Sequence, residues 1–237
     1  MSGVRPSEDR WLLLHGTPLT PSVWTDIVTH LQRTGAVRCP WITPGNTSEA
    51  QPDVARRLRD DLQDVTGDLH VVGHSFGGQV ALELALAMPQ RVGSLTILCS
   101  RDTPFPPFAA AAQALPGYGP ADLDAVLSRW FRPAELAADG PLVRYARRCL
   151  ITADRALWAT SLRAIAGYDR SDLTPTIDVP VTLIAAELDQ VSTPAAMTAM
   201  AGRLSHARLH VLPEAAHMSP FLHPEALARL IAEGRGH

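Results

Sequence analysis

A glycine-flanked serine stands where an apolar stretch of the sequence gives way to an alanine- and leucine-rich one. The segment Leu69–Gly78 reads LHVVGHSFGG, which places Ser75 at the centre of a Gly-x-Ser-x-Gly motif. Between a buried strand and a helix, this motif forms a sharp, strained turn that lifts the serine hydroxyl above a sheet, and larger flanking side chains would collide. The motif therefore predicts that Ser75 is a nucleophile. The alternative, an ordinary helix N-cap, would leave the motifs below unexplained.

Two backbone N–H groups are candidates for stabilising the oxyanion that such an attack creates. Phe76 follows the serine at the predicted helix N-terminus, where N–H groups favour negative charge. The segment His15–Pro18 directly follows the apolar run Trp11–Leu14, and its loop can direct the N–H of Thr17 at the same oxygen. The His15 side chain itself is expected only to stabilise this loop.

A general base and an acid that orients it are expected later in the chain. Asp189 follows the apolar run Val181–Ala185, and His217 follows the run Arg208–Leu212. The carboxyl ends of parallel strands share one edge of a sheet, where Ser75 is also expected to emerge. The order Ser, Asp, His predicts that Asp189 orients His217 and that His217 activates the serine.

Three other residues compete for these roles. His223 is the rival base, although its place before a Pro-Glu pair suits a helix start better. Glu187 and Asp102 are the rival acids. Glu187 lies nearer its strand end, and Asp102 follows the apolar run Leu95–Cys99, at the end of a different strand. We favour Asp189 over both.

The elements that must position these residues alternate along the chain. The predicted strands are Trp11–Leu14, Ala36–Cys39, Leu69–Val72, Leu95–Cys99, Val181–Ala185 and Arg208–Leu212. Helical patterns lie between them: Val54, Leu58, Leu62 and Val65 form one stripe, and Val80–Met88 is rich in alanine and leucine. Strands alternating with helices predict an α/β fold with a doubly wound, mostly parallel sheet of about six strands.

The alternation breaks between residues 102 and 174, where roughly seventy residues separate two strands that a few residues would normally connect. The pattern here is helical, and the predicted helices are Ala109–Leu115, Ala121–Phe131, Ala134–Leu150 and Ala153–Ile165. We expect residues 102–174 to form a helical lid, inserted into a core made of residues 1–101 and 175–237.

The predicted lid is rich in aromatic residues, and ligand pockets are mostly apolar. The candidates for binding substrate are Trp130, Phe131, Tyr145 and Trp158. A lid with an apolar, partly aromatic inner surface predicts a preference for uncharged, hydrophobic substrates, because an unpaired carboxylate is costly to bury. An inward-facing Arg144, Arg147 or Arg148 would reverse that preference.

The composition argues against several classes of partner. The 237 residues carry 24 acidic and 21 basic side chains, a net charge of −3 without a long run of one sign, which disfavours nucleic acid and anionic membranes. A small-molecule substrate fits better, with the chain a monomer or a homodimer. Cys39, Cys99 and Cys149 show neither a disulfide framework nor zinc-ligand spacing. No signal peptide or membrane span is visible, so a cytoplasmic setting is expected.

Together these motifs resemble the α/β-hydrolase superfamily, specifically its small bacterial esterases, enol-lactonases and cofactor-free perhydrolases with a helical lid. The matching segments are LLLHGTP, VVGHSFGGQVALELA, PVTLIAAELDQVSTP and LPEAAHMSPFLHPEAL, in the order of that family. The resemblance implies a triad of Ser75, Asp189 and His217, with Thr17 and Phe76 as oxyanion donors. Because histidine activates the nucleophile, neither a metal nor an organic cofactor is expected.

Two segments depart from the family pattern. The HGTP segment begins at residue 15, so the opening β-hairpin usual in the family is expected to be absent or rudimentary. The segment Pro40–Ser48 replaces a loop that borders the pocket in relatives, and their substrate preferences therefore do not transfer directly.

The expected reaction is hydrolysis of a small, largely apolar carboxylic ester or lactone through an acyl-enzyme on Ser75. The same scaffold and triad also serve C–C hydrolases, thioesterases, lyases and perhydrolases, which are the alternatives. A non-catalytic ligand receptor or a cyclase is an alternative of a different class.

Overall fold

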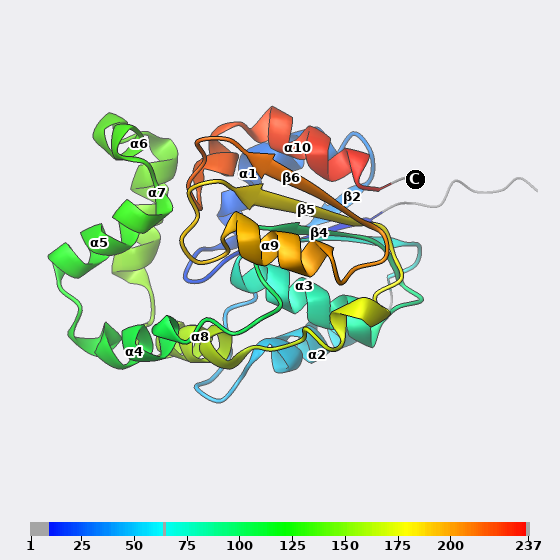
Figure 1. Ribbon diagram of the computed structural model, residues 1–237, viewed down its shortest axis with the longest axis horizontal. Coiled ribbons are helices and arrows are strands. Elements are labelled where there is room, and N and C mark those ends of the chain that lie inside the picture. The colour runs from blue at the N-terminus through cyan, green and yellow to red at the C-terminus, as the bar shows by residue number, and fades with distance from the viewer. Residues whose placement is uncertain (1–9, 64, 236–237) are drawn as a thin grey trace, which may run out of the picture.

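The strands form one six-stranded sheet in the computed structural model, which describes residues 10–63 and 65–235 (Figure 1). Parts of the predicted core, residues 1–9, 64 and 236–237, lie outside the described residues. The strands are β1 (Arg10–Leu14), β2 (Ala36–Arg38), β3 (Leu69–His74), β4 (Val92–Leu98), β5 (Val181–Ala186) and β6 (Ala207–Leu212). They match the six predicted runs, with shifts only at the ends.

The order of the strands is β2-β1-β3-β4-β5-β6, and every neighbouring pair is parallel. In the sheet, β2 lies on one side of β1 and β3 lies on its other side, so the direction in which strands are added reverses at β1. The crevice outside the carboxyl ends of β1 and β3 is therefore the switch point of the sheet, where open α/β sheets bind ligands. The first described strand, β1, is parallel to both of its neighbours, and the expectation about an opening hairpin falls on residues outside the described ones.

Helices cover both faces of the sheet because its strands are apolar on both sides. Trp11 and Leu13 of β1 pack into one core, whereas Leu12 and Leu14 pack into the other. The first core holds residues of α1 (Thr25–Leu31) and α10 (Pro224–Glu233), which contact each other. The second core holds residues of α2 (Gln51–Asp61), α3 (Phe76–Ala87) and α9 (Pro194–Ala201). The doubly wound arrangement is as predicted.

The α-helices between β4 and β5, here called the helical insertion, lie beyond the carboxyl ends of the strands, and the segment after them runs back to the start of β5 (Figure 1). These helices are α4 (Pro107–Ala114), α5 (Pro120–Trp130), α6 (Pro133–Ala138), α7 (Pro141–Thr152) and α8 (Arg155–Gly167). The chain also contains short 3-10 helices, of which η2 (Leu115–Gly117) and η3 (Thr174–Thr176) lie between β4 and β5, whereas η1 (Pro21–Trp24) and η4 (Ser219–Leu222) lie elsewhere. Helix α4 packs on α8 and α5 on α7.

One predicted helix of the insertion, Ala134–Leu150, is wrong because the structure divides it into α6 and α7. Asp139 ends α6 in the left-handed conformation, with a φ of 41°, and Pro141 begins α7 as its first residue. Proline lacks the N–H that a continuous helix would need and suits a first turn, so Gly140–Pro141 starts a new helix.

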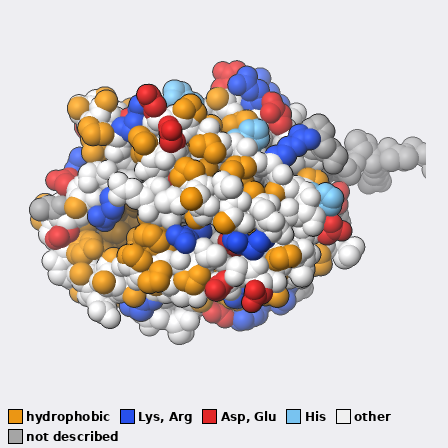
Figure 2. Space-filling view, viewed as in Figure 1, with side chains coloured by type: hydrophobic (Ala, Val, Ile, Leu, Met, Phe, Trp, Pro, Cys, Tyr) orange, Lys and Arg blue, Asp and Glu red, His pale blue; other side chains and the backbone are white. Residues whose placement is uncertain are grey.

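Hydrophobic side chains also reach the surface of this part of the molecule. Figure 2 shows them gathered in a hollow on the side occupied by the helical insertion. Among the described residues, no helix has the length and apolar character to span a bilayer.

The loop after β1 is tied to the segment after β2 through the buried His15. Its Nδ1 donates to the carbonyl of Gly16 at 2.9 Å, and its Nε2 accepts from the N–H of Ile42 at 3.3 Å. Burial lowers the pKa of His15 to about 4, against the opposing effect of the Gly16 hydrogen bond. His15 is therefore neutral at pH 7 and stabilises the loop, as the sequence analysis expects.

We predict that Gly77→Ala destabilises the fold. A Cβ at Gly77 would lie 2.3 Å from the carbonyl oxygen of Leu14 and 2.6 Å from that of His15. The gain in helix propensity from alanine, about 1 kcal/mol, is smaller than the cost of such overpacking, about 1–3 kcal/mol or more. Urea denaturation should show a lower free energy of unfolding. Gly167→Ala, where a Cβ would meet nothing within 4 Å, is the control, and equal stability of both variants would contradict the close approach.

We also predict a pH-dependent contribution of His15 to stability. The pKa of His15 in the folded protein, about 4, lies below its ordinary value of 6.5. As the pH falls, His15 is therefore protonated in the unfolded chain before it is protonated in the folded one. Relative to His15→Asn, the wild-type protein should therefore lose unfolding free energy as the pH falls from about 6.5 to about 4. Denaturation curves across this range test the shift, and a constant difference between the two proteins would refute it.

Candidate active site

The turn between β3 and α3 holds Ser75 in a strained backbone conformation. Its φ of 54° and ψ of −120° lie outside the regions that side-chain-bearing residues normally occupy. The N–H of Ser75 donates to the carbonyl of Leu98 at 3.0 Å, and the Ser100 hydroxyl donates to the Ser75 carbonyl at 2.6 Å. A Cβ on Gly73 would lie 2.2 Å from the Gly77 carbonyl oxygen. The strained turn predicted by the motif is present, and its neighbours hold it there.

Two N–H groups near this turn have no acceptor among the described residues. Phe76 is the first residue of α3, where the helix geometry leaves the N–H without an intrahelical partner. Thr17 lies in the loop after β1 and lines the same cavity as Ser75. Both N–H groups can therefore donate a hydrogen bond to a ligand that reaches them.

Asp189 and His217 form a buried, hydrogen-bonded pair. The Nδ1 of His217 lies 2.7 Å from Oδ2 of Asp189, while Oδ1 accepts from the N–H groups of Val191 and Ser192 at 2.8 and 3.1 Å. Burial opposes ionisation of Asp189, but the nearby His217 and the three hydrogen bonds outweigh it and hold the pKa of the carboxyl below its usual value. A charged Asp189 fixes the proton of His217 on Nδ1, which leaves Nε2 as an acceptor.

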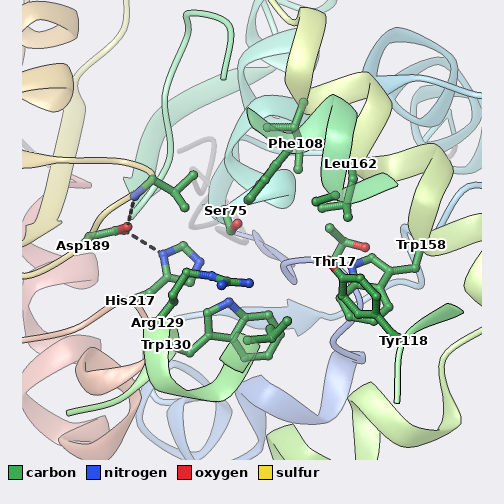
Figure 3. A pocket seen from close by; sticks show the side chains of 14 residues that line it. Thr17, Ser75, Phe108, Tyr118, Arg129, Trp130, Trp158, Leu162, Asp189 and His217 are labelled. Carbon is green, nitrogen blue, oxygen red and sulfur yellow. Dashed lines mark hydrogen bonds and ion pairs between the residues drawn. The ribbon is translucent and has the colours of Figure 1, made fainter. Parts of the chain in front are cut away.

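Ser75, Asp189 and His217 line one cavity, although they come from distant parts of the chain (Figure 3). In the described part of the chain, no hydrogen bond joins the Ser75 hydroxyl to the His217 ring. Such contacts are often long in the absence of a ligand and shorten when a substrate binds. The structure therefore brings the three residues together and leaves the Ser75 hydroxyl available.

The rival residues are engaged elsewhere. Asp102 is fully buried and accepts hydrogen bonds from Arg203, at 2.6 and 2.9 Å, and from Thr174, at 2.9 Å. Glu187 accepts from the N–H of the exposed Glu214, and His223 is the N-cap residue of α10. None of the three rivals lines the cavity.

His74 packs beneath the candidate base. Its ring centroid lies 4.7 Å from that of His217, and its Nε2 lies 3.4 Å from the His217 carbonyl oxygen. Burial lowers the pKa of His74 well below its ordinary value, and the neighbouring His217 lowers it further. His74 is therefore a neutral packing residue that also supports the His217 backbone.

Hydrogen bonds tie the His217 loop to the helical insertion. The Ser219 hydroxyl donates to the Glu135 carboxylate, with its oxygens at 2.9 and 3.0 Å, and accepts from the N–H of Ala216 at 2.8 Å. The N–H of Met218 donates to the Trp130 carbonyl at 2.9 Å. These bonds fix the position of the candidate base relative to α5 and α6.

The cavity over Ser75 is mostly apolar, as ligand-binding pockets usually are. Its lining residues are Thr17, Ser75, Phe108, Ala111, Tyr118, Val126, Arg129, Trp130, Trp158, Leu162, Ile165, Asp189, Val191 and His217.

Of the four aromatic candidates for substrate binding, Trp130 and Trp158 line the cavity, but Phe131 and Tyr145 do not. Phe131 is 1% exposed and packs in the core, because it follows the last residue of α5 and its side chain turns inward. The Tyr145 hydroxyl donates to the Thr20 carbonyl at 3.0 Å and accepts from the Thr20 N–H at 2.9 Å. These two assignments are therefore corrected.

Several lining residues were not expected from the sequence, and Arg129 is the charged one among them. Val126, Arg129 and Trp130 are spaced i, i+3 and i+4 on α5, so they share one helix face. This periodicity was a usable signal, since Trp130 was already a candidate. The three arginines that were considered, Arg144, Arg147 and Arg148, do not line the cavity.

One cluster has the donor types of a metal site. Ligand atoms of Cys99, Asp189 and His217 lie within 4.8 Å of one another. Asp189 and His217 are hydrogen-bonded to each other, and burial raises the pKa of the Cys99 thiol well above its usual value, which disfavours the thiolate that metals bind. The arrangement therefore fits an orienting pair better than a metal site.

Solved structures share this fold. A hydrolase from Pseudomonas aeruginosa aligns with a TM-score of 0.87 at 23% identity, covering 97% of this chain and 91% of its own. The enol-lactonase from Burkholderia xenovorans aligns with a TM-score of 0.81 at 21% identity, covering 97% and 92%. At these identities the likeness concerns the fold alone.

Sequence comparison reaches further. A pimeloyl-[acyl-carrier protein] methyl ester esterase from Aromatoleum aromaticum is 30% identical over 94% of this chain and 96% of its own length. Lipase LipV from Mycobacterium tuberculosis is 36% identical, in a match that covers 38% of this chain and 36% of the lipase. Residues 11–230 match the alpha/beta hydrolase family, and the chain therefore belongs to that family and is a hydrolase of the small bacterial esterase branch.

Proposed function

We propose that the protein cleaves a small, largely apolar carboxylic ester or lactone through an acyl-enzyme on Ser75. The supporting observation is the buried Asp189–His217 hydrogen bond of 2.7 Å, in the same cavity wall as a serine held at positive φ. Relatives named as an esterase and a lipase agree with ester hydrolysis.

In the proposed first step, Nε2 of His217 takes the proton of the Ser75 hydroxyl as its oxygen attacks the carbonyl carbon. The N–H groups of Thr17 and Phe76 stabilise the oxyanion, and each such donor typically contributes about 3–4 kcal/mol. The protonated His217 then gives its proton to the leaving alcohol oxygen, and the C–O bond breaks. In the second step, water activated by His217 releases the acyl group.

Asp189 acts in this scheme through His217. Because its pKa is held below the usual value, the carboxylate stays charged at neutral pH and stabilises the imidazolium that forms in each step. Its second oxygen is anchored by the Val191 and Ser192 N–H groups, so the ring orientation is set by backbone as well as by the side-chain pair.

The helical insertion would act as a lid over the reaction. Its inner wall is partly aromatic, with Phe108, Tyr118, Trp130 and Trp158, and Leu162 adds an aliphatic side chain. A wall of this kind favours an apolar acyl group, because each buried methylene adds about 0.8 kcal/mol. C–C hydrolases, thioesterases, lyases and perhydrolases would use the same residues, and an inert receptor would use the cavity alone.

We predict that Ser75→Ala folds normally but loses esterase turnover. Without the nucleophile, kcat for a short-chain aryl ester should fall by at least about 10⁴-fold. The exposed Ser205, in the loop before β6, provides the control variant Ser205→Ala, which should keep full activity. Undiminished turnover by a correctly folded Ser75→Ala would overturn the assignment.

We also predict that turnover needs no metal. The potential metal-ligand atoms Oδ2 of Asp189 and Nδ1 of His217 are hydrogen-bonded to each other, and in the proposed mechanism histidine activates the nucleophile. Prolonged dialysis against a chelator should therefore leave kcat/KM unchanged. Loss of activity that added metal restores would contradict the proposal.

A further inference from the structure

The cavity wall carries one cation that the proposed mechanism does not use. Arg129 is an exposed residue of α5 that lines the cavity, and Figure 3 shows its side chain extending on the same side as His217 and Trp130. The Trp130 ring lies 6.5 Å from the His217 ring, centroid to centroid, which places this part of α5 beside the candidate base.

Arg129 is also without a partner among the described residues: no hydrogen bond or ion pair is made by its guanidinium. Other arginines of the insertion do have partners. Arg144 pairs with Asp139 and Arg147 with Asp124, while Arg155 donates to the carbonyl of Leu115. Arg148 is exposed and unpaired as well, but it does not line the cavity.

No carboxylate of the wall is free to neutralise Arg129. Asp189 is the acidic residue among the described lining residues, and its oxygens already accept hydrogen bonds from His217, Val191 and Ser192. An anionic group of a ligand is therefore the partner that this side of the cavity lacks.

The position of Arg129 also indicates which part of the ligand would carry the charge. His217 must give its proton to the leaving alcohol oxygen, so the leaving group lies on the His217 side of the cavity. Arg129 lies on that side, whereas Tyr118, Trp158 and Leu162 form an apolar wall away from it (Figure 3). The acyl group would occupy the apolar part.

We propose that Arg129 determines specificity by pairing with a carboxylate on the alcohol portion of the substrate, beside an apolar acyl group. The inference rests on the proposed ester hydrolysis and names its substrate class. It revises the expectation of an uncharged substrate, because an exposed guanidinium at the cavity mouth lets the carboxylate pair without leaving water completely.

The test compares phenyl butyrate with 4-carboxyphenyl butyrate. We expect Arg129→Gln to lower the ratio of kcat/KM for the anionic ester over the neutral ester by about fivefold, the effect of one exposed ion pair. Intrinsic reactivity cancels, because both esters are compared between enzymes. Arg129→Lys should keep most of the ratio, and Arg148→Gln, the matched exposed arginine on α7, should leave it unchanged.

Monophenyl glutarate, which carries its carboxylate on the acyl portion, tests whether Arg129 pairs with a carboxylate on the alcohol portion. Arg129→Gln should change kcat/KM for this ester less than for 4-carboxyphenyl butyrate. An unchanged ratio in Arg129→Gln, an equal fall in Arg148→Gln, or a larger effect on monophenyl glutarate would each overturn the inference.

Binding separates failure of the inference from failure of the proposed function. In the Ser75→Ala background, calorimetry should show that 4-hydroxybenzoate binds more tightly than phenol and that Arg129→Gln removes the difference. Absence of phenyl butyrate turnover in the wild-type protein would refute the proposed ester hydrolysis, whereas equal binding of 4-hydroxybenzoate and phenol would refute the role of Arg129.

Discussion

The close approach of β1, β3 and the start of α3 is the constraint on which the site depends. Gly73 and Gly77 leave no room for a Cβ, because the atoms that would meet it are backbone atoms of α3 and β1. This contact forces the chain through the turn in which Ser75 has a φ of 54°. The strain is held by hydrogen bonds from both sides of the turn, so the sheet and helix together fix where the hydroxyl emerges.

The other parts of the site follow from the order of the strands. Because β1 and β3 lie at the switch point, the Thr17 loop and the Ser75 turn meet at one crevice, and the parallel β5 and β6 deliver Asp189 and His217 to the same edge. The His217 loop is anchored further by Ser219 and Glu135. The position of the insertion and the orientation of the candidate base are therefore coupled through these hydrogen bonds.

Much of this arrangement could be predicted from local sequence. The apolar runs located all six strands, and the Gly-x-Ser-x-Gly motif predicted the turn at Ser75, because both depend on neighbours in the chain. Gly140–Pro141 is a local signal for a helix break, but the predicted helix Ala134–Leu150 extended across it because the apolar pattern continues on both sides. The direction in which Phe131 and Tyr145 point depends on tertiary packing, which periodicity does not encode. Arg129 was overlooked, although Val126, Arg129 and Trp130 are spaced i, i+3 and i+4 and therefore share one face of α5.

Covalent labelling is the most direct test of whether Ser75 attacks an electrophile. The wild-type protein should be treated with a fluorophosphonate at neutral pH and analysed by intact mass and peptide mapping. We expect one adduct per chain, located on Ser75, and strongly reduced labelling in His217→Gln, which lacks the base. A folded wild-type protein that stays unlabelled, or that is labelled on another serine, would contradict this role of Ser75.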